Sequence, residues 1–204
     1  MKNFDVLIIG GGVAGLSCAL ILGSALTKPF AKDKKVGILT HQKNSALQTA
    51  ELNNVLGFKK GTKGDDVLKE GIVQLTEMYP QIDQIENEKA IAVLEDSNGV
   101  LIKTNKNTYT AATVVVCVSP SNMFNIEGLM HYVQPHQAIP AIKEKIMLKN
   151  TNHLITKNIY VAGVLAGWRS QYAIAAGSGS QVATDILTEW NGGNHTMIHD
   201  VIEE

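Results

Sequence analysis

The feature that most constrains this chain is the turn Gly10-Gly11-Gly12-Val13-Ala14-Gly15, which directly follows a short apolar run. Gly10, Gly12 and Gly15 have the G-x-G-x-x-G spacing of a dinucleotide-binding turn. The first glycine permits the tight turn, the second leaves room for a pyrophosphate, and the third lets the next helix pack against the sheet. The N–H groups of the first helical turn would then face the phosphates.

The segments around this turn supply the context that the glycine spacing needs. Residues 4–9 form a β-branched apolar run that predicts a buried parallel strand. Residues 13–26 predict a helix, and residues 35–39 predict a second strand. Strand, glycine turn, helix and strand within about 40 residues make a βαβ unit, which indicates dinucleotide binding over a purely structural turn.

The second strand lacks the acidic residue that usually binds the adenosine ribose. Thr40 occupies the expected position, and no carboxylate follows in His41-Gln42. A hydroxyl makes a weaker, neutral hydrogen bond than a carboxylate does. We therefore expect lower cofactor affinity. Without this carboxylate, the usual reason to favour NAD over its phosphorylated form is also absent.

The rest of the chain alternates in the same way. Residues 40–64 are polar and predict mostly loop, and residues 65–79 predict a helix with Gly64 and Asp65 as its cap. Turn residues separate short predicted strands within 81–118, the last ending in the apolar run 114–118. Residues 119–152 show no period, residues 158–163 predict a strand, and residues 171–190 predict a long helix.

The amino-acid composition limits which classes of protein and partner are possible. The 204 residues are 45% apolar and 18% charged, as in an ordinary globular domain. Lys+Arg 18 against Asp+Glu 19 gives no basic footprint for nucleic acid or an anionic membrane, so neither is an expected partner. The N-terminus has no basic region or cleavage site of a signal peptide, and a cytoplasmic location is the default expectation.

Cysteine and histidine give no metal or redox motif. Cys18 and Cys117 lie in apolar stretches far apart, which predicts two buried small hydrophobic side chains. His195 and His199 have i, i+4 spacing, but a polar tail is favoured over a metal site. We expect no metal, and no catalytic residue can be assigned.

Four stretches in chain order resemble thioredoxin reductases and related pyridine nucleotide-disulfide flavoproteins. The first is residues 1–22, and the second is Asn54-Val55-Leu56-Gly57-Phe58 with the helix after Gly64, similar to the family's N-x-P-G-F segment. Residues 114–119 correspond to a strand ending A-T-G. Residues 159–164 and 171–179 resemble the family's A-G-D and R-Q-A-x-x-A-A-G-x-G segments.

The resemblance implies FAD as the cofactor and places residues around it. These would be Gly10, Gly12, Val13, Ala14 and Gly15 at the pyrophosphate; Thr40 and Lys43 near the adenosine; Gln48, Thr49 and Asn54 beside the flavin ring; Gly163 and Val164 near the ribityl chain and pyrophosphate; and Gln171, Tyr172 and Ala173 at the helix start facing the flavin's pyrimidine edge. His41 and Ala90 are also expected among the FAD-binding residues. A helix N-terminus suits that edge because reduced flavin is anionic there.

Departures from the family pattern are equally informative. Val164 replaces the family's Asp, and Cys117-Val118-Ser119 replaces A-T-G. The family inserts an NADPH domain carrying C-x-x-C between the two halves of its FAD domain, whereas only residues 119–152 separate them here. A βαβ unit alone takes about 30 residues, so no nucleotide domain fits in this segment. A self-sufficient thioredoxin reductase is excluded.

The expected fold is a three-layer α/β, FAD/NAD(P)-binding Rossmann-like domain with a central parallel sheet and a small β-meander. We expect one domain over 1–204, with halves 1–118 and 153–190, the connection 119–152 and a tail 191–204. A homodimer would cover the surface that the missing domain covers in the family.

Three functional hypotheses remain at this point. The first is a thioredoxin-reductase-like FAD flavoprotein that relies on an external electron donor or acceptor. The alternative is a non-catalytic nucleotide-binding or interaction module that has lost redox activity, and the third is a plain NAD-binding domain.

Overall fold

The computed structural model describes residues 1–41 and 45–199. Its centre is a sheet whose main path runs in the order β11-β12-β8-β1-β2-β5. The parallel strands are β1 (Lys2–Ile9), β2 (Val36–Thr40), β5 (Asp83–Glu86), β8 (Thr108–Val116) and β12 (Ile159–Val161). Their carboxyl ends meet at one edge, because Ile9 pairs with both Leu39 and Val116. The expected parallel sheet and βαβ unit are confirmed.

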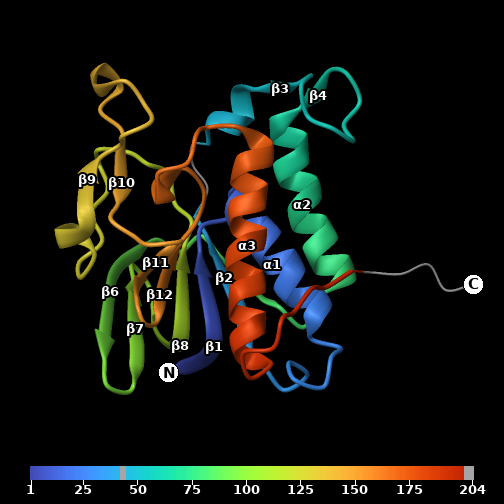
Figure 1. Cartoon of the computed structure of the whole chain (residues 1–204), viewed down its shortest axis with the longest axis vertical. Helices are drawn as coiled ribbons and strands as arrows, with labels where there is room; N and C mark the ends of the chain where they lie inside the picture. Colours follow the sequence, from blue (N-terminus) through green and yellow to red (C-terminus); the bar gives the residue numbers. More distant parts are fainter. Residues whose placement is uncertain (42–44, 200–204) are drawn as a thin grey trace, which may run out of the picture.

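Strand β8 joins this sheet to the predicted meander. Its first half pairs antiparallel with β7 (Gly99–Thr104), which pairs with β6 (Ala90–Asp96). Its last residues, Val114–Val116, pair instead with β12. The second half of the chain therefore adds its strand directly to the sheet formed by the first half (Figure 1). Strand β11 (Leu154–Thr156), which the sequence did not predict, closes this edge antiparallel to β12.

Three helices cover one face of the sheet (Figure 1). They are α1 (Val13–Ala25), α2 (Gly64–Met78) and α3 (Tyr172–Trp190), all close to their predicted bounds. One buried cluster lies between these layers. It includes Val6, Ile8 and Ile38 from the strands and Leu22 and Ile186 from the helices. Apolar burial of this kind contributes about 25 cal/mol per Å² and is the main force holding the helices to the sheet.

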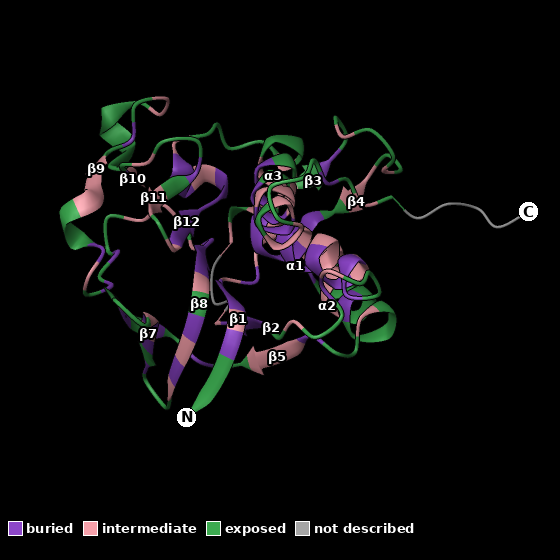
Figure 2. Ribbon diagram, turned by 60° about the horizontal axis from the view of Figure 1, so that its bottom comes forward, coloured by how far each residue is buried: buried purple, intermediate pink, exposed green. Residues whose placement is uncertain are grey.

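The opposite face is covered by the meander and by the connection 119–152, which lie across the sheet from the three helices in Figure 2. The connection contains η2 (Met130–Tyr132), β9 (Val133–Pro135), η3 (Ala141–Lys143) and β10 (Ile146–Leu148). Its Phe124, Leu129 and Leu148 join Leu7 and Leu39 of the sheet in a second buried cluster. The connection is thus an ordered part of the third layer.

Some sequence expectations need correction. The helix α2 is not capped by Gly64 and Asp65: it begins at Gly64 after Lys63, and Asp65 lies in its first turn, paired with Lys69 at 2.6 Å. The last meander strand ends at Val116 rather than residue 118. The predicted loop 40–64 includes η1 (Ala46–Thr49) and the short pair β3 (Glu51–Leu52) and β4 (Thr62–Lys63).

Both cysteines are buried and free, as predicted. Burial raises the pKa of the Cys117 thiol to about 12 and that of Cys18 well above its usual value, with the Cys117 charge adding to the latter. Thiolates are the reactive form, so neither side chain is suited to thiol chemistry at neutral pH. Within residues 1–41 and 45–199, no helix combines the length and apolar character needed to cross a membrane.

Candidate cofactor-binding site

The glycine turn lies at the carboxyl edge of β1, and two of its glycines are required by packing. Gly10 has φ +118°, and a Cβ there would lie 2.6 Å from the Cys117 carbonyl oxygen. A Cβ at Gly15 would overlap the Gly10 carbonyl oxygen. Both positions therefore need glycine for the turn to fold and for α1 to approach the sheet.

Gly12 differs from its neighbours because nothing in the chain requires it to be glycine. It is the N-cap of α1 with φ −79° and ψ −176°, an extended conformation open to any residue. A Cβ there would meet no atom within 4 Å. Its backbone borders open space, so a ligand can approach it more closely than a side chain would allow.

The first turn of α1 has the electrostatics of an anion site. The N-cap makes no side-chain hydrogen bond, and the first turn contains no acidic residue. The first N–H groups of a helix have no intrahelical acceptor, and the helix dipole places partial positive charge there. Val13, Ala14 and Gly15 thus present their backbone toward the open space beside Gly12, as a pyrophosphate requires.

The second half of the chain packs against this first turn of α1. Gly163 has φ +74°, and a Cβ there would lie 3.0 Å from the Ala14 Cβ. A Cβ at Gly179, in α3, would overlap the Ala14 carbonyl oxygen. These close approaches bring the short helix η4 (Gly163–Ala166) and α3 to the glycine turn. Segments that are far apart in the sequence therefore lie side by side at the glycine turn.

Side chains from elsewhere fix the backbone of the loop 163–167. Ser178 Oγ accepts the Gly163 N–H at 2.8 Å, and Asn150 Nδ2 donates to the Ala166 carbonyl at 3.1 Å. His136 Nδ1 accepts the Ala138 N–H, so its Nε2 carries the proton and donates to the Val164 carbonyl at 3.0 Å. Val164, where the resemblance predicts Asp, thus lies in a loop held through the Gly163 N–H and the Val164 and Ala166 carbonyl groups.

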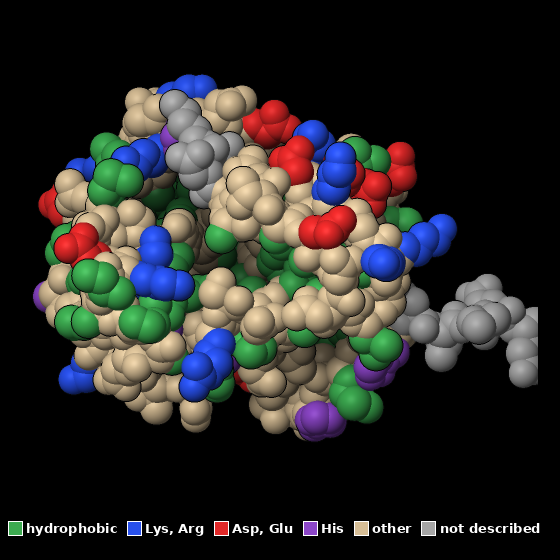
Figure 3. Space-filling view, turned by 90° about the horizontal axis from the view of Figure 1, so that it is seen from above, with side chains coloured by type: hydrophobic (Ala, Val, Ile, Leu, Met, Phe, Trp, Pro, Cys, Tyr) green, Lys and Arg blue, Asp and Glu red, His purple; other side chains and the backbone are tan. Residues whose placement is uncertain are grey.

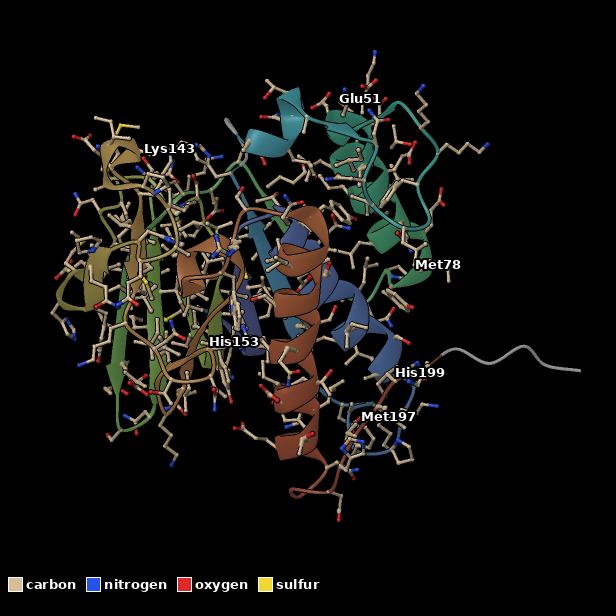
Figure 4. The ribbon with its side chains drawn as sticks, turned by 45° about the horizontal axis from the view of Figure 1, so that its top comes forward. Glu51, Met78, Lys143, His153, Met197 and His199 are labelled. Carbon is tan, nitrogen blue, oxygen red and sulfur yellow. The ribbon has the colours of Figure 1, made fainter. Side chains whose placement is uncertain are left out.

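A buried histidine lies behind the same loop. His153 is 6% exposed and lies between the sheet and α3 (Figure 4). The Trp168 indole N–H donates to its Nε2 at 2.9 Å, so this nitrogen is unprotonated, and Ser178 Oγ lies at 2.9 Å from it. Burial lowers the pKa of His153, and the Asp185 carboxylate partly opposes this.

These loop residues were missed by the sequence analysis. His136, Asn150 and His153 lie in or next to the segment 119–152, which shows no periodicity. Their partners are 16 to 28 residues away in the chain. A polar residue that bonds a group far away in the chain leaves no local pattern, so only the three-dimensional structure reveals it.

At the start of α3, the three predicted residues have different surroundings. Gln171 is the N-cap without a side-chain cap, and Ala173 is exposed. The Tyr172 ring packs edge-on against Phe58, with centroids 5.1 Å apart. Tyr172 and Phe58 both line a groove of about 150 Å³ between α1 and α2. Burial raises the pKa of the Tyr172 phenol, and its contacts are those of a packing residue.

The loop before α2 uses two of its predicted site residues locally. Gln48 Oε1 accepts the Ser45 N–H at 2.8 Å in a capping box that starts η1. Thr49 Oγ1 donates to the Ala46 carbonyl at 3.4 Å. Asn54 is exposed and makes no hydrogen bond within the part of the chain that the structure describes.

The residues expected near the adenosine lie at the end of β2 and in the meander. Thr40 is 9% exposed, and its hydroxyl donates to the Ile85 carbonyl of β5 at 3.5 Å. His41 follows β2 and is half-buried, whereas Lys43 lies outside the described residues. Ala90 is buried in the second core cluster, where it packs against apolar side chains.

Other candidates do not form a site. Residues 194–199 form no helix, so His195 and His199 do not share a helical face. No cluster of three or more His, Cys, Asp or Glu suited to a metal occurs among residues 1–41 and 45–199. Arg169 is exposed.

Seen from above, the molecule is hollowed over the carboxyl edge of the sheet, and hydrophobic side chains show inside the hollow (Figure 3). The site therefore combines an apolar hollow with the open, N–H-rich backbone at Gly12. This is the composition expected of a dinucleotide cofactor site at the carboxyl ends of parallel strands.

Comparisons with known proteins agree with this geometry. The family model for pyridine nucleotide-disulphide oxidoreductases matches residues 4–178. The structure is similar to a thioredoxin reductase from Gloeobacter violaceus, with TM-score 0.69 and 15% identity over 100% of both chains. An oxidoreductase from Agrobacterium tumefaciens gives TM-score 0.71 and 13% identity, over 95% of this chain and 100% of that chain.

A ferredoxin-flavin thioredoxin reductase from Clostridium acetobutylicum gives TM-score 0.69 and 17% identity, over 94% of this chain and 99% of that chain. No curated protein sequence matches the chain. At these identities the solved structures establish a shared fold, and the sequence match over residues 4–178 establishes the wider relationship.

Proposed function

The chain belongs to the pyridine nucleotide-disulphide oxidoreductase family, and on that premise we propose that it is a FAD-binding flavoprotein that receives electrons from a separate donor. The family relationship that four sequence stretches indicated is confirmed, and with it the oxidoreductase class. The cofactor, its residues and the need for a partner are our proposal.

The main support for FAD binding comes from Gly12. Its conformation and packing leave glycine unexplained within the chain, and the space beside it adjoins the unpartnered N–H groups of the first turn of α1. The pyrophosphate of FAD would be held there by the backbone of Val13, Ala14 and Gly15. When bound, FAD supplies the electron-accepting flavin ring.

The second half of the chain favours FAD over a nicotinamide dinucleotide. The loop 163–167 and the N-terminus of α3 converge on the same edge, and the first turn of α3 contains no acidic residue. A helix N-terminus stabilises negative charge, which reduced flavin carries. A simple NAD-binding unit needs no second site that stabilises negative charge on the cofactor.

The need for a separate donor rests on the sequence between the halves. The 204 residues contain one G-x-G-x-x-G and no C-x-x-C. Residues 119–152, where the family inserts its nucleotide domain, instead form β9, β10 and two short helices that cover the sheet. Both cysteines are buried with raised thiol pKa values. These features support our inference that electrons arrive from, and leave to, other molecules.

Anaerobic reduction of the FAD-loaded protein tests this function. We expect the protein to bind FAD, to show little flavin bleaching with NADPH or NADH alone, and to bleach fully with dithionite or a reduced electron-carrier protein. Rapid bleaching by NADPH or NADH alone would contradict the requirement for a separate donor.

One observation favours a second candidate, a nucleotide-binding module without redox activity. Thr40 and Val164 replace two acidic anchors, and the hydroxyl of Thr40 is already bonded to β5. In that case bound flavin would stay oxidised with every protein donor while dithionite still bleaches it. Thermal shifts with FAD and with NAD separate both candidates from a plain NAD-binding domain, because the true ligand raises the melting temperature most.

A further inference from the structure

The carboxyl edge of the sheet offers a carboxylate that replaces the one missing from β2. Strand β5 is the parallel neighbour of β2 and ends at Glu86, which pairs in register with Thr40. In-register residues of adjacent strands point to the same face of the sheet. We propose that the carboxylate of Glu86 accepts a hydrogen bond from the 2′-hydroxyl of the cofactor's adenosine ribose. This inference rests on the proposed function.

The position of Glu86 suits this role. Ile9, Thr40 and Glu86 end three adjacent parallel strands, so Glu86 lies two strands from the glycine turn on the same edge. Neighbouring strands are about 4.8 Å apart, a separation that one glutamate side chain spans. A carboxylate from β5 can therefore reach the space above the end of β2, where the ribose of a dinucleotide lies in this fold.

The chain after β5 is bent over the end of β2. Asn87 has φ +58°, and its N–H donates to the Thr40 carbonyl at 2.8 Å. Glu88 then turns into the protein, where Thr104, Asn107 and Tyr109 donate to its carboxylate at 2.6, 2.7 and 3.0 Å. Of the two carboxylates flanking Asn87, Glu88 is thus fully used by the fold.

Glu86 is the carboxylate left available. Its side chain is exposed and makes no hydrogen bond or ion pair with any residue in the described ranges 1–41 and 45–199. Thr40, beside it, already donates its hydroxyl to Ile85. A ribose hydroxyl is a donor, and a carboxylate accepts from it in a charge-assisted hydrogen bond stronger than any that Thr40 can offer.

The proposal also predicts which nucleotide is rejected. A carboxylate at this position repels a phosphate on the ribose 2′-oxygen, as acidic residues do at the end of the second strand in other dinucleotide sites. The site would select FAD or another nucleotide with a free 2′-hydroxyl. The acidic residue that binds the ribose then lies at Glu86 of β5 instead of at position 40 of β2.

The test measures dissociation constants of FAD, ADP and 2′-deoxy-ADP for the wild-type protein, Glu86→Gln and Glu77→Gln. Glu77 is an exposed glutamate of α2 and serves as the matched control. We expect Glu86→Gln to weaken FAD and ADP about tenfold or more, as for loss of a hydrogen bond to a charged group. Affinity for 2′-deoxy-ADP should be the same in Glu86→Gln and wild type, and Glu77→Gln should match wild type with all three ligands.

Each other outcome has a distinct meaning. Unchanged ADP affinity in Glu86→Gln, or an equal loss for ADP and 2′-deoxy-ADP, would overturn the role of Glu86. A wild-type protein that binds ADP in a Glu86-dependent way but binds no FAD would overturn the proposed function and leave the ribose contact standing. Binding of neither ligand by the wild type would overturn both. Thermal unfolding of the variants confirms that they fold.

Discussion

The glycine turn 10–15 and the loop 163–167 meet at the same site but are built differently. The turn is shaped by close backbone approaches, since a Cβ at Gly15 would overlap the carbonyl of Gly10, five residues earlier, and a Cβ at Gly10 would lie 2.6 Å from the Cys117 carbonyl oxygen. The loop is held by side chains from outside it, namely His136, Asn150 and Ser178. The turn therefore depends on close backbone packing, including that of Gly10 against Cys117, whereas the loop depends on side-chain hydrogen bonds.

This difference teaches where cofactor binding and stability are separable. In the turn the two requirements fall on different residues three positions apart, because Gly15 is required by packing and Gly12 only by a ligand. In the loop one set of hydrogen bonds serves both purposes. Substitutions in the two regions should therefore give different ratios of lost affinity to lost stability.

The largest effect is expected from Gly15→Ala. The added Cβ would overlap the Gly10 carbonyl oxygen, so either α1 or the turn must move. We expect a loss of about 3 kcal/mol or more in the free energy of unfolding, measured by urea denaturation. Gly177→Ala is the control, because a Cβ at Gly177 meets nothing within 4 Å and alanine favours the interior of α3. A stability loss under 1 kcal/mol for Gly15→Ala would show that the turn is not constrained as described.

Gly12→Asp should separate binding from folding. Aspartate is a good N-cap and favours the positive end of α1, so the free energy of unfolding should stay constant or rise by up to about 1 kcal/mol. The same carboxylate occupies the phosphate site, and FAD affinity should fall at least about 100-fold, or about 2.7 kcal/mol. Gly12→Ser, a cap without charge, is the matched variant and should lose less affinity. Retained FAD binding in Gly12→Asp would contradict the assignment of the phosphate site.

Asn150→Ala should lower stability and affinity together. Its Nδ2 donates to the carbonyls of Leu148 and Ala166, and its Oδ1 accepts the His153 N–H. We expect a loss of about 2 kcal/mol in the free energy of unfolding and a few-fold weaker FAD binding, because the loop 163–167 loses a constraint. Asn122→Ala, which removes an exposed bond to Glu144, is the control. Lost stability with unchanged FAD affinity would remove this loop from the site.

The smallest effect concerns the pH dependence of stability. The pKa of His153 is lowered in the folded state by burial, so the unfolded chain takes up its proton first. Stability is therefore complete above the unfolded pKa of about 6.5 and falls as pH drops below it toward the folded pKa. His153→Gln, which has no proton to gain, should show a flatter profile between pH 7 and 5 in thermal unfolding. An identical profile in both proteins would show that this histidine is not the titrating group.

The sequence predicted most of the fold because its strands and helices have strong local periods. The runs 6–9 and 114–116 are fully apolar and rich in β-branched residues, and α1 and α3 were placed within one or two residues. It did not predict β11 or the structure within 119–152. Strands β9, β10 and β11 have three residues each, too few for a clear period, and Phe124 and Leu129 are buried by the sheet without any periodic pattern.

The site was predicted in the same uneven way. The glycine turn was located from spacing alone, and the resemblance brought Gly163 and α3 to it. The roles of Gln48, Tyr172 and Ala90 could not be foreseen, since their side chains are used for a capping box, a ring contact and a core position. Likewise, the register of Thr40 with Glu86 emerges only when β5 is paired with β2.

The most direct test of the central claim is a titration of the wild-type apoprotein with FAD, followed by the absorption spectrum of the complex after gel filtration. We predict that flavin elutes with the protein at one equivalent per chain, and that Gly12→Asp elutes colourless while remaining folded. Wild-type protein that elutes without flavin would contradict the claim that the carboxyl edge of this sheet holds FAD.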